Sequence, residues 1–187
     1  MRIHKAIYKS SSILLLITFI AMISCDQPDP TAPQDISAKV STVKILKKSN
    51  LRLNKYFQAS QLIMSGTGGI VSVGDNASGF SYLEFDPGDI NANSYPNGAQ
   101  ITFDWESSDL LSGDFGPHGI QFAHPVYLRL SYKDADLTGI DVNNLHIYWW
   151  NDSTEQYDYV TSSSNPDSQF VYAYINHFSR YAIGTDN

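Results

Sequence analysis

Cysteine is nearly absent from this 187-residue chain, in which Cys25 is the only one. A single thiol excludes a disulfide framework of the kind that supports small secreted domains. No pair of the five histidines has a metal-ligand spacing either. We therefore expect no structural metal and no cofactor.

Long apolar runs and basic residues are also scarce. The longest apolar run, Ile13–Ile23, has eleven residues, whereas a membrane-spanning helix needs about 20. From Tyr56 onward only Arg129, Lys133 and Arg180 stand against sixteen acidic residues, a balance of −13. Such a charge repels phosphate backbones, so we expect no nucleic-acid partner.

The short apolar run is typical of a secretory signal, because three basic residues and no acid precede it and Ser24 and Cys25 follow it. A cysteine just after the cut resembles the bacterial lipoprotein signal, in which the thiol is lipidated and becomes the new N-terminus. We expect residues 1–24 to be removed and acyl chains on Cys25 to hold the protein in a membrane. The alternative is an ordinary cleaved signal with a chance cysteine.

Two segments separate Cys25 from the predicted domain. Residues 25–38 are polar and proline-rich, which is typical of a flexible tether. Residues 39–64 form a basic connecting segment, with six lysines or arginines and no acid within 39–55. This stretch is either a solvated tether or basic edge strand, or a contact for anionic headgroups next to the anchor.

Period-two alternation dominates residues 65–187. Ile101, Phe103 and Trp105, for example, share one face of a run whose intervening residues are polar. Clusters of Gly, Pro, Asn and Asp separate such runs, and no helical stripe of ten residues interrupts them. We predict about eight short strands in an all-β, antiparallel β-sandwich.

Aromatic residues alternate with aliphatic ones in the last predicted strands. Tyr148, Trp150, Tyr172 and Tyr174 fall on the faces opposite the aliphatic sets, whereas Trp149 falls on an aliphatic face. Exposed aromatic strips bind sugars or protein partners, so we predict that these four residues form a binding surface. Alternatively they pack in cross-strand pairs or lie beneath another segment.

Six segments in this order carry a resemblance to a known family: 65–71, 83–88, 116–122, 125–128, 145–151 and 177–183. The specific parts are the spacing of Phe122, Pro125 and Val126 and the closing His-Phe-Ser-x-Tyr of residues 177–181. Together they resemble the ZU-five domain, the β-sandwich module of zona-occludens scaffolds, ankyrins and Unc-five netrin receptors. The resemblance implies a β-sandwich over residues 65–184.

The resemblance also gives His177, Phe178 and Ser179 a chemical interpretation, because some ZU-five proteins cut themselves between Phe and Ser of this motif. It implies attack of the Ser179 hydroxyl on the Phe178 carbonyl, with His177 accepting the proton and water then hydrolysing the ester. The alternative is that the three residues only close the last strand. We expect an intact bond, since cleavage needs a strained peptide.

Other candidate sites are weaker. Asp134, Asp136 and Asp141 in one loop, and Asp86 and Asp89 in another, have ligand chemistry for calcium. Their spacing matches no known calcium loop, so we interpret them as solvated turn residues. No Ser-His-Asp set follows from spacing, and we predict no enzymatic activity.

These patterns predict an extracytoplasmic protein, anchored to a bacterial membrane through Cys25, with a non-enzymatic protein-interaction or structural role. Its unidentified partner is a protein or a glycan. The alternatives are a self-processing domain that cleaves Phe178–Ser179 and a carbohydrate-binding module that uses exposed aromatics.

Replacing Cys25 tests the anchor. Cells fed a fatty-acid analogue should label the wild-type protein, whereas Cys25→Ser should remain unlabelled because the acylated thiol is gone. Equal labelling of the two proteins, or release of the wild type into the aqueous phase of a detergent partition, contradicts lipidation.

Overall fold

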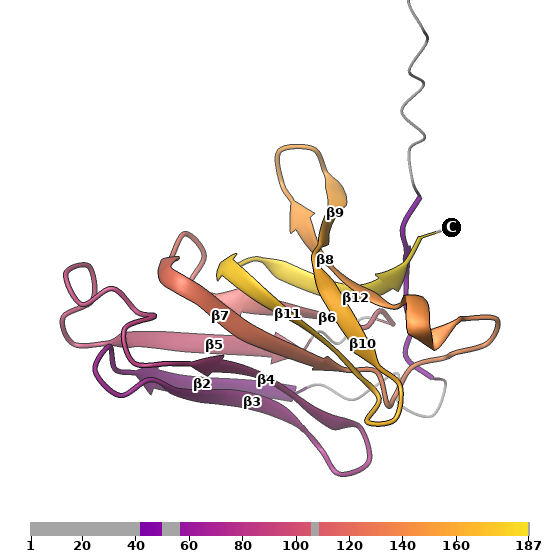
Figure 1. Cartoon of the computed structure of the whole chain (residues 1–187), viewed down its shortest axis with the longest axis horizontal. Coiled ribbons are helices and arrows are strands. Elements are labelled where there is room, and N and C mark those ends of the chain that lie inside the picture. The colour runs from indigo at the N-terminus through magenta and orange to yellow at the C-terminus, as the bar shows by residue number, and fades with distance from the viewer. Residues whose placement is uncertain (1–41, 50–56, 106–108, 187) are drawn as a thin grey trace, which may run out of the picture. The chain divides into compact units, whose positions relative to one another are not determined.

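Two antiparallel β-sheets pack face to face in the computed structural model, which describes residues 42–49, 57–105 and 109–186 (Figure 1). In order, the seven-stranded sheet contains β2 (Phe57–Ile63), β5 (Ala99–Trp105), β6 (Ser112–Gly116), β12 (Arg180–Thr185), β8 (His146–Asn151) and β9 (Gln156–Val160), with β1 (Lys44–Ile45) also paired to β12. The five-stranded sheet contains β10 (Ser162–Asn165), β11 (Phe170–His177), β7 (Gln121–Ser131), β4 (Gly79–Phe85) and β3 (Gly69–Asp75). The predicted all-β antiparallel sandwich is confirmed.

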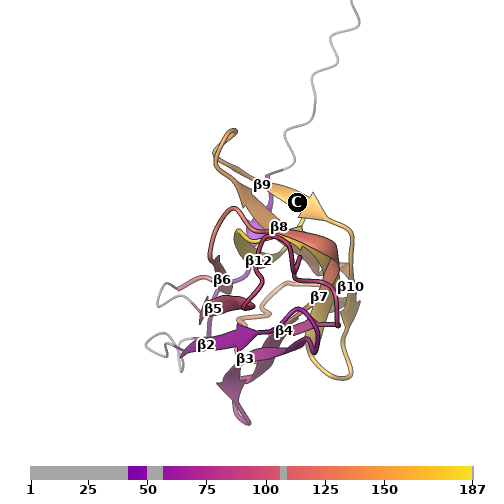
Figure 2. The ribbon, with the colours of Figure 1, turned by 90° about the vertical axis from the view of Figure 1, so that its left-hand side faces the viewer.

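The two layers are seen edge-on in Figure 2, with β5 and β6 on one side and β7 and β10 on the other. A single 3₁₀ turn, η1 (Val142–Asn144), is the only helical element among the described residues. No helix in those ranges is long and apolar enough to cross a membrane.

Alternation buries one face of each central strand between the sheets. In β5, Ile101 and Phe103 are fully buried, and the Phe103 ring lies 4.2 Å from that of Phe115 in β6. From the opposite sheet, Val126, Leu128 and Leu130 of β7 point into the same core. Each such side chain contributes about 1.5–3 kcal/mol through burial, which holds the two sheets together.

The sandwich begins earlier than the boundary expected at residue 65. β2 lies within the segment 39–64 and pairs along its whole length with β5. Upstream of it, Leu46 is buried, its N–H donates to the Ile183 carbonyl, and its own carbonyl accepts from Leu111 N–H. β2 is hard to recognise in the sequence because Leu62 interrupts its alternation: Ile63 is buried, whereas Leu62 is 51% exposed on the outer face of this edge strand. The predicted signal and tether, residues 1–38, lie outside the described residues.

The tryptophan pair in β8 differs from its expected pattern, in which Trp149 is core and Trp150 exposed. Both are half-buried. Trp149 does pack against the core cluster, and Trp150 packs on Tyr157 in the β8–β9 hairpin, with 5.2 Å between ring centroids. This hairpin projects from the sandwich in Figure 1, so its residues are only partly covered on either face.

Two leucines provide a test of the core. Leu128→Ala should lower the free energy of unfolding by about 2–5 kcal/mol, because it leaves a cavity beside the central strand β7. The matched change Leu62→Ala, at a leucine that is 51% exposed, should stay within about 0.5 kcal/mol of wild type. Urea melts measure both, and equal destabilisation contradicts this packing.

Candidate functional site

His177, Phe178 and Ser179 carry the chain from one sheet to the other. β11 ends at His177 in the five-stranded sheet, and β12 begins at Arg180 in the seven-stranded sheet. Between them Phe178 is buried, with its ring edge-on to Phe85 and Phe122 at centroid distances of 6.4 and 4.8 Å. The motif therefore connects two strands in different sheets and does not simply close the last strand, as one interpretation of the sequence had it.

Hydrogen bonds fix both ends of this crossing. The Ser179 hydroxyl donates to the Trp150 carbonyl at 2.9 Å, and the Tyr181 hydroxyl donates to the His177 carbonyl at 2.8 Å. The His177 ring packs edge-on against Trp149 at 5.0 Å, and its Nδ1 lies 3.2 Å from the Phe178 carbonyl oxygen. In this arrangement the proton of Ser179 points to a backbone carbonyl and not to His177. Desolvation raises the pKa of Tyr181 far above its usual value, so its hydroxyl stays a donor.

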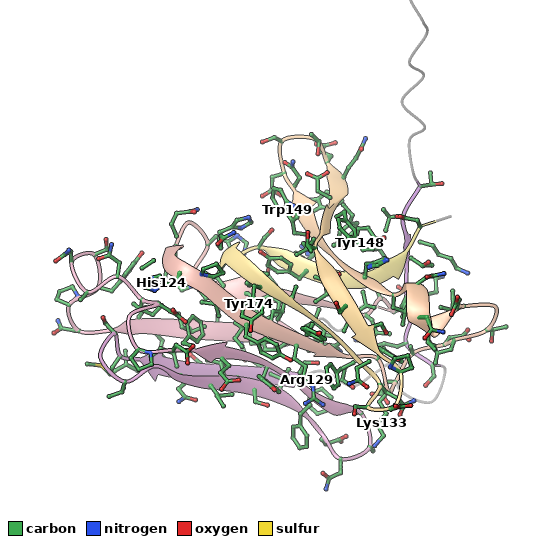
Figure 3. The ribbon with its side chains drawn as sticks, viewed as in Figure 1. His124, Arg129, Lys133, Tyr148, Trp149 and Tyr174 are labelled. Atoms are coloured by element: carbon green, nitrogen blue, oxygen red, sulfur yellow. The ribbon has the colours of Figure 1, made fainter. Side chains whose placement is uncertain are left out.

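The four aromatics predicted as one binding surface lie on different sheets. Tyr148 and Trp150 belong to β8 of the seven-stranded sheet, whereas Tyr172 and Tyr174 belong to β11 of the five-stranded sheet. Figure 3 labels Tyr148 and Tyr174. Alternation gives the face of each strand but not which strands are neighbours. The sequence therefore grouped residues that the fold separates.

Tyr148 also differs from expectation because it is buried, with 1% of its surface exposed. Its hydroxyl donates to Asp186 Oδ1 at 2.8 Å, and its ring lies 6.0 Å from that of Tyr159 on the adjacent strand. Desolvation, and then the bond to Asp186, raise the pKa of Tyr148 far above its usual value. Its neighbours therefore come from other parts of the chain, with Tyr159 on β9 and Asp186 just after β12.

The outer face of the five-stranded sheet gathers tyrosines from three adjacent strands. Strand register aligns Tyr82 of β4, Arg129 of β7 and Tyr172 of β11 in one row. The next row contains Glu84 of β4, Tyr127 of β7 and Tyr174 of β11. We call this surface the tyrosine face; it comprises Tyr82, Glu84, Tyr127, Arg129, Tyr172 and Tyr174.

Tyr127 lies at the centre of the tyrosine face. Its ring centroid is 5.9 Å from that of Tyr82, 5.8 Å from that of Tyr172 and 5.5 Å from that of Tyr174. Desolvation is the main cause that raises the pKa of Tyr127, and the neighbouring tyrosines add to it. The rings support one another and form a preorganised aromatic platform.

Arg129 supplies the positive charge of the tyrosine face. Its guanidinium carbon lies 4.0 Å from the ring centroid of Phe170 and 5.4 Å from that of Tyr82. Its Nε is buried and has no hydrogen-bond partner. Phe170, beside the tyrosine face, and Tyr82, within it, thus hold this cation through cation–π contacts.

Two hollows flank the exposed ring of Tyr174, which is 62% exposed. One, of about 390 Å³, is lined by tyrosines and carboxylates: Tyr82, Tyr127, Tyr174, Glu84, Asp86 and Asp89, together with Pro125. We call it the acidic hollow. The other, of about 280 Å³, is lined by Tyr172, Ala173, Tyr174 and the hydroxyl residues 161–163. Tyr174, which is labelled in Figure 3, lines both hollows and forms the ridge between them.

Tyr82 and Tyr127 were not among the site residues predicted from the sequence. Each alternates with buried residues in its own strand, which marks it as outward-facing. Only the order β11-β7-β4 brings them beside Tyr172 and Tyr174, and that order comes from connections that period-two patterns do not encode.

The loop aspartates stabilise turns. Asp136 Oδ1 accepts from the N–H and hydroxyl of Thr138, and these bonds lower the pKa of Asp136. Asp141 accepts from Asn143 N–H at the start of η1, and buried Asp89 accepts from Asp86 N–H at 2.7 Å. In the part of the chain that the structure describes, no group of three or more His, Cys, Asp or Glu side chains is placed to hold a metal ion.

Comparisons with known proteins give no family for this chain. No protein-family model matches the sequence, and no curated protein matches it. The resemblance to the ZU-five domain therefore stays a prediction from the sequence.

The contacts of Ser179 predict a structural effect without cleavage. Ser179→Ala removes the bond to the Trp150 carbonyl and should lower the free energy of unfolding by about 1 kcal/mol. Ser163→Ala, at an exposed serine of β10, should change it little. Denaturing mass spectrometry of the wild type should show no fragment beginning at Ser179. If this fragment is present in the wild type and absent from both Ser179→Ala and His177→Ala, the expectation of an intact Phe178–Ser179 bond is contradicted.

Proposed function

We propose that this protein is a non-enzymatic binding protein of the bacterial cell envelope and that the tyrosine face is its binding site. The observation that carries the proposal is the gathering of tyrosines from β4, β7 and β11 on one outer sheet face, beside two hollows. Tyrosine supplies a large contact area and a polar hydroxyl at low cost in conformational entropy, which suits recognition of a macromolecular partner.

The distribution of polar groups supports binding at this surface. Arg129 lies in the middle of the aromatic platform, and the carboxylates of Glu84 and Asp86 lie at its rim. Aromatic rings combined with charged groups, Arg among them, are the arrangement found at interaction sites.

The placement of the protein in the envelope is part of the proposal and rests on the sequence. Lipidation of Cys25 at the end of the signal places the sandwich outside the cytoplasm, joined to the membrane by the polar, proline-rich tether. A domain on such a tether presents its outer sheet face to a partner without contacting the lipid.

A photo-crosslinking amino acid tests the proposed face in cells. Placed at Tyr172, it should form an adduct with the partner, because this residue lies between Arg129 and the ridge of Tyr174. Placed at Tyr159, an exposed tyrosine of the other sheet, it should form none. Tyr174→Ala should reduce the adduct formed from position 172.

The two crosslinking positions are a matched pair, since both replace a surface tyrosine within a strand. Adducts of equal yield from positions 172 and 159, or none from 172, contradict the proposed face. The mass of the adduct separates the candidate partners, because a protein adds a discrete mass and a glycan adds a distribution of masses.

A further inference from the structure

The acidic hollow combines two features that both favour positive charge. Glu84, Asp86 and Asp89 contribute three carboxylates, and no lysine or arginine lines the hollow. Tyr82, Tyr127 and Tyr174 line the same hollow with aromatic side chains. Carboxylates attract a cation directly, and aromatic rings attract it through their quadrupoles.

The cations near the hollow already have other contacts. Arg129 packs on Phe170 and Tyr82, in the row next to the hollow. The ring of His124 places Nδ1 3.5 Å from Asp89 Oδ1, so this histidine lies close to the buried carboxylate. Glu84 and Asp86 are exposed and face the hollow with their charges available to a ligand.

Charge excludes several occupants of this surface. Anionic headgroups and nucleic acids are repelled by the three carboxylates and by the balance of −13 from Tyr56 onward. A second copy of this chain that met the first through the same face would bring the same three carboxylates against the first set. A positively charged partner is the complement that remains.

We infer that the acidic hollow binds a primary ammonium group, and that the ligand of the tyrosine face is a lysine-bearing segment of a partner protein. The inference rests on the proposed function and names the chemistry of its partner. An ammonium group in the hollow contacts the carboxylates of Glu84 and Asp86, and its aliphatic stem lies along the rings of Tyr127 and Tyr174. A polypeptide fits better than an amino sugar because its flexible lysine stem places apolar methylene groups against the rings while its ammonium stays in the polar hollow.

Titration calorimetry of the full chain with a short, N-acetylated peptide of alternating lysine and glycine tests the inference. The wild type should bind the peptide, and binding should weaken as salt increases, because the charges are exposed. Glu84→Gln combined with Asp86→Asn should weaken binding about tenfold through loss of two charge contacts. Asp89 is left unchanged, because its buried carboxylate accepts the Asp86 N–H bond.

A matched control separates local contacts from overall charge. Asp152→Asn combined with Glu155→Gln also removes two negative charges, but from the exposed turn between β8 and β9 on the other sheet. This control should bind the peptide as the wild type does. The same peptide acetylated at every lysine should not bind, because its ammonium groups are gone.

Four outcomes overturn the inference: no binding of the lysine peptide, equal binding of the acetylated peptide, equal weakening by the control pair, or tighter binding of a glucosamine oligomer. In the last outcome the hollow still binds an ammonium group, but the ligand that carries it is a glycan and not a protein. If the lysine peptide does not bind but the crosslinker at position 172 still forms an adduct, the inference about the ammonium group is wrong and the proposed binding face is still supported. Urea melts of each variant verify that its fold is intact.

Discussion

The crossing at His177–Ser179 is the constraint on which the rest of the sandwich depends. β11 and β12 are both inner strands of their sheets, and only two residues separate them. A link this short brings the end of an inner strand of one sheet next to the start of an inner strand of the other. Two kinds of contact fix the geometry of this link. Phe178 is buried against Phe85 and Phe122. The hydroxyl groups of Ser179 and Tyr181 donate to backbone carbonyls.

The tyrosine face is a consequence of that geometry. β11 leads into the crossing, and it pairs with β7 until a register irregularity between Ile175 and His177. The inward residues of these strands fill the core, so their alternate residues must face outward. Tyr127, Tyr172 and Tyr174 are therefore aligned by the same pairing that stabilises the fold, and a ligand meets rings that are already held in place.

The alternation of apolar and polar residues along the sequence predicts much of this structure. The features that it does not predict depend on which strands pair with one another. Alternation around Ile101 and Leu128 was enough to predict strands, inward faces and a sandwich. It did not reveal β2, an edge strand in which the exposed Leu62 interrupts the alternation, nor the burial of Tyr148, which depends on the neighbours β12 and β9. The candidate site shows the same limit, because half of its tyrosines were identified only once β4, β7 and β11 were known to be adjacent.

The two sheets differ in what their outer faces offer. On the seven-stranded sheet, the outward position of Tyr148 is covered, and its hydroxyl is bound to Asp186. On the five-stranded sheet, no strand or helix of the described residues covers Tyr174, which remains mostly exposed beside three carboxylates. Mutual ring packing stabilises that surface without covering it, since each tyrosine contacts its neighbours along the sheet rather than a layer above. The exposed rings of this platform are free to exchange water for a partner, whereas the buried ring of Tyr148 is not.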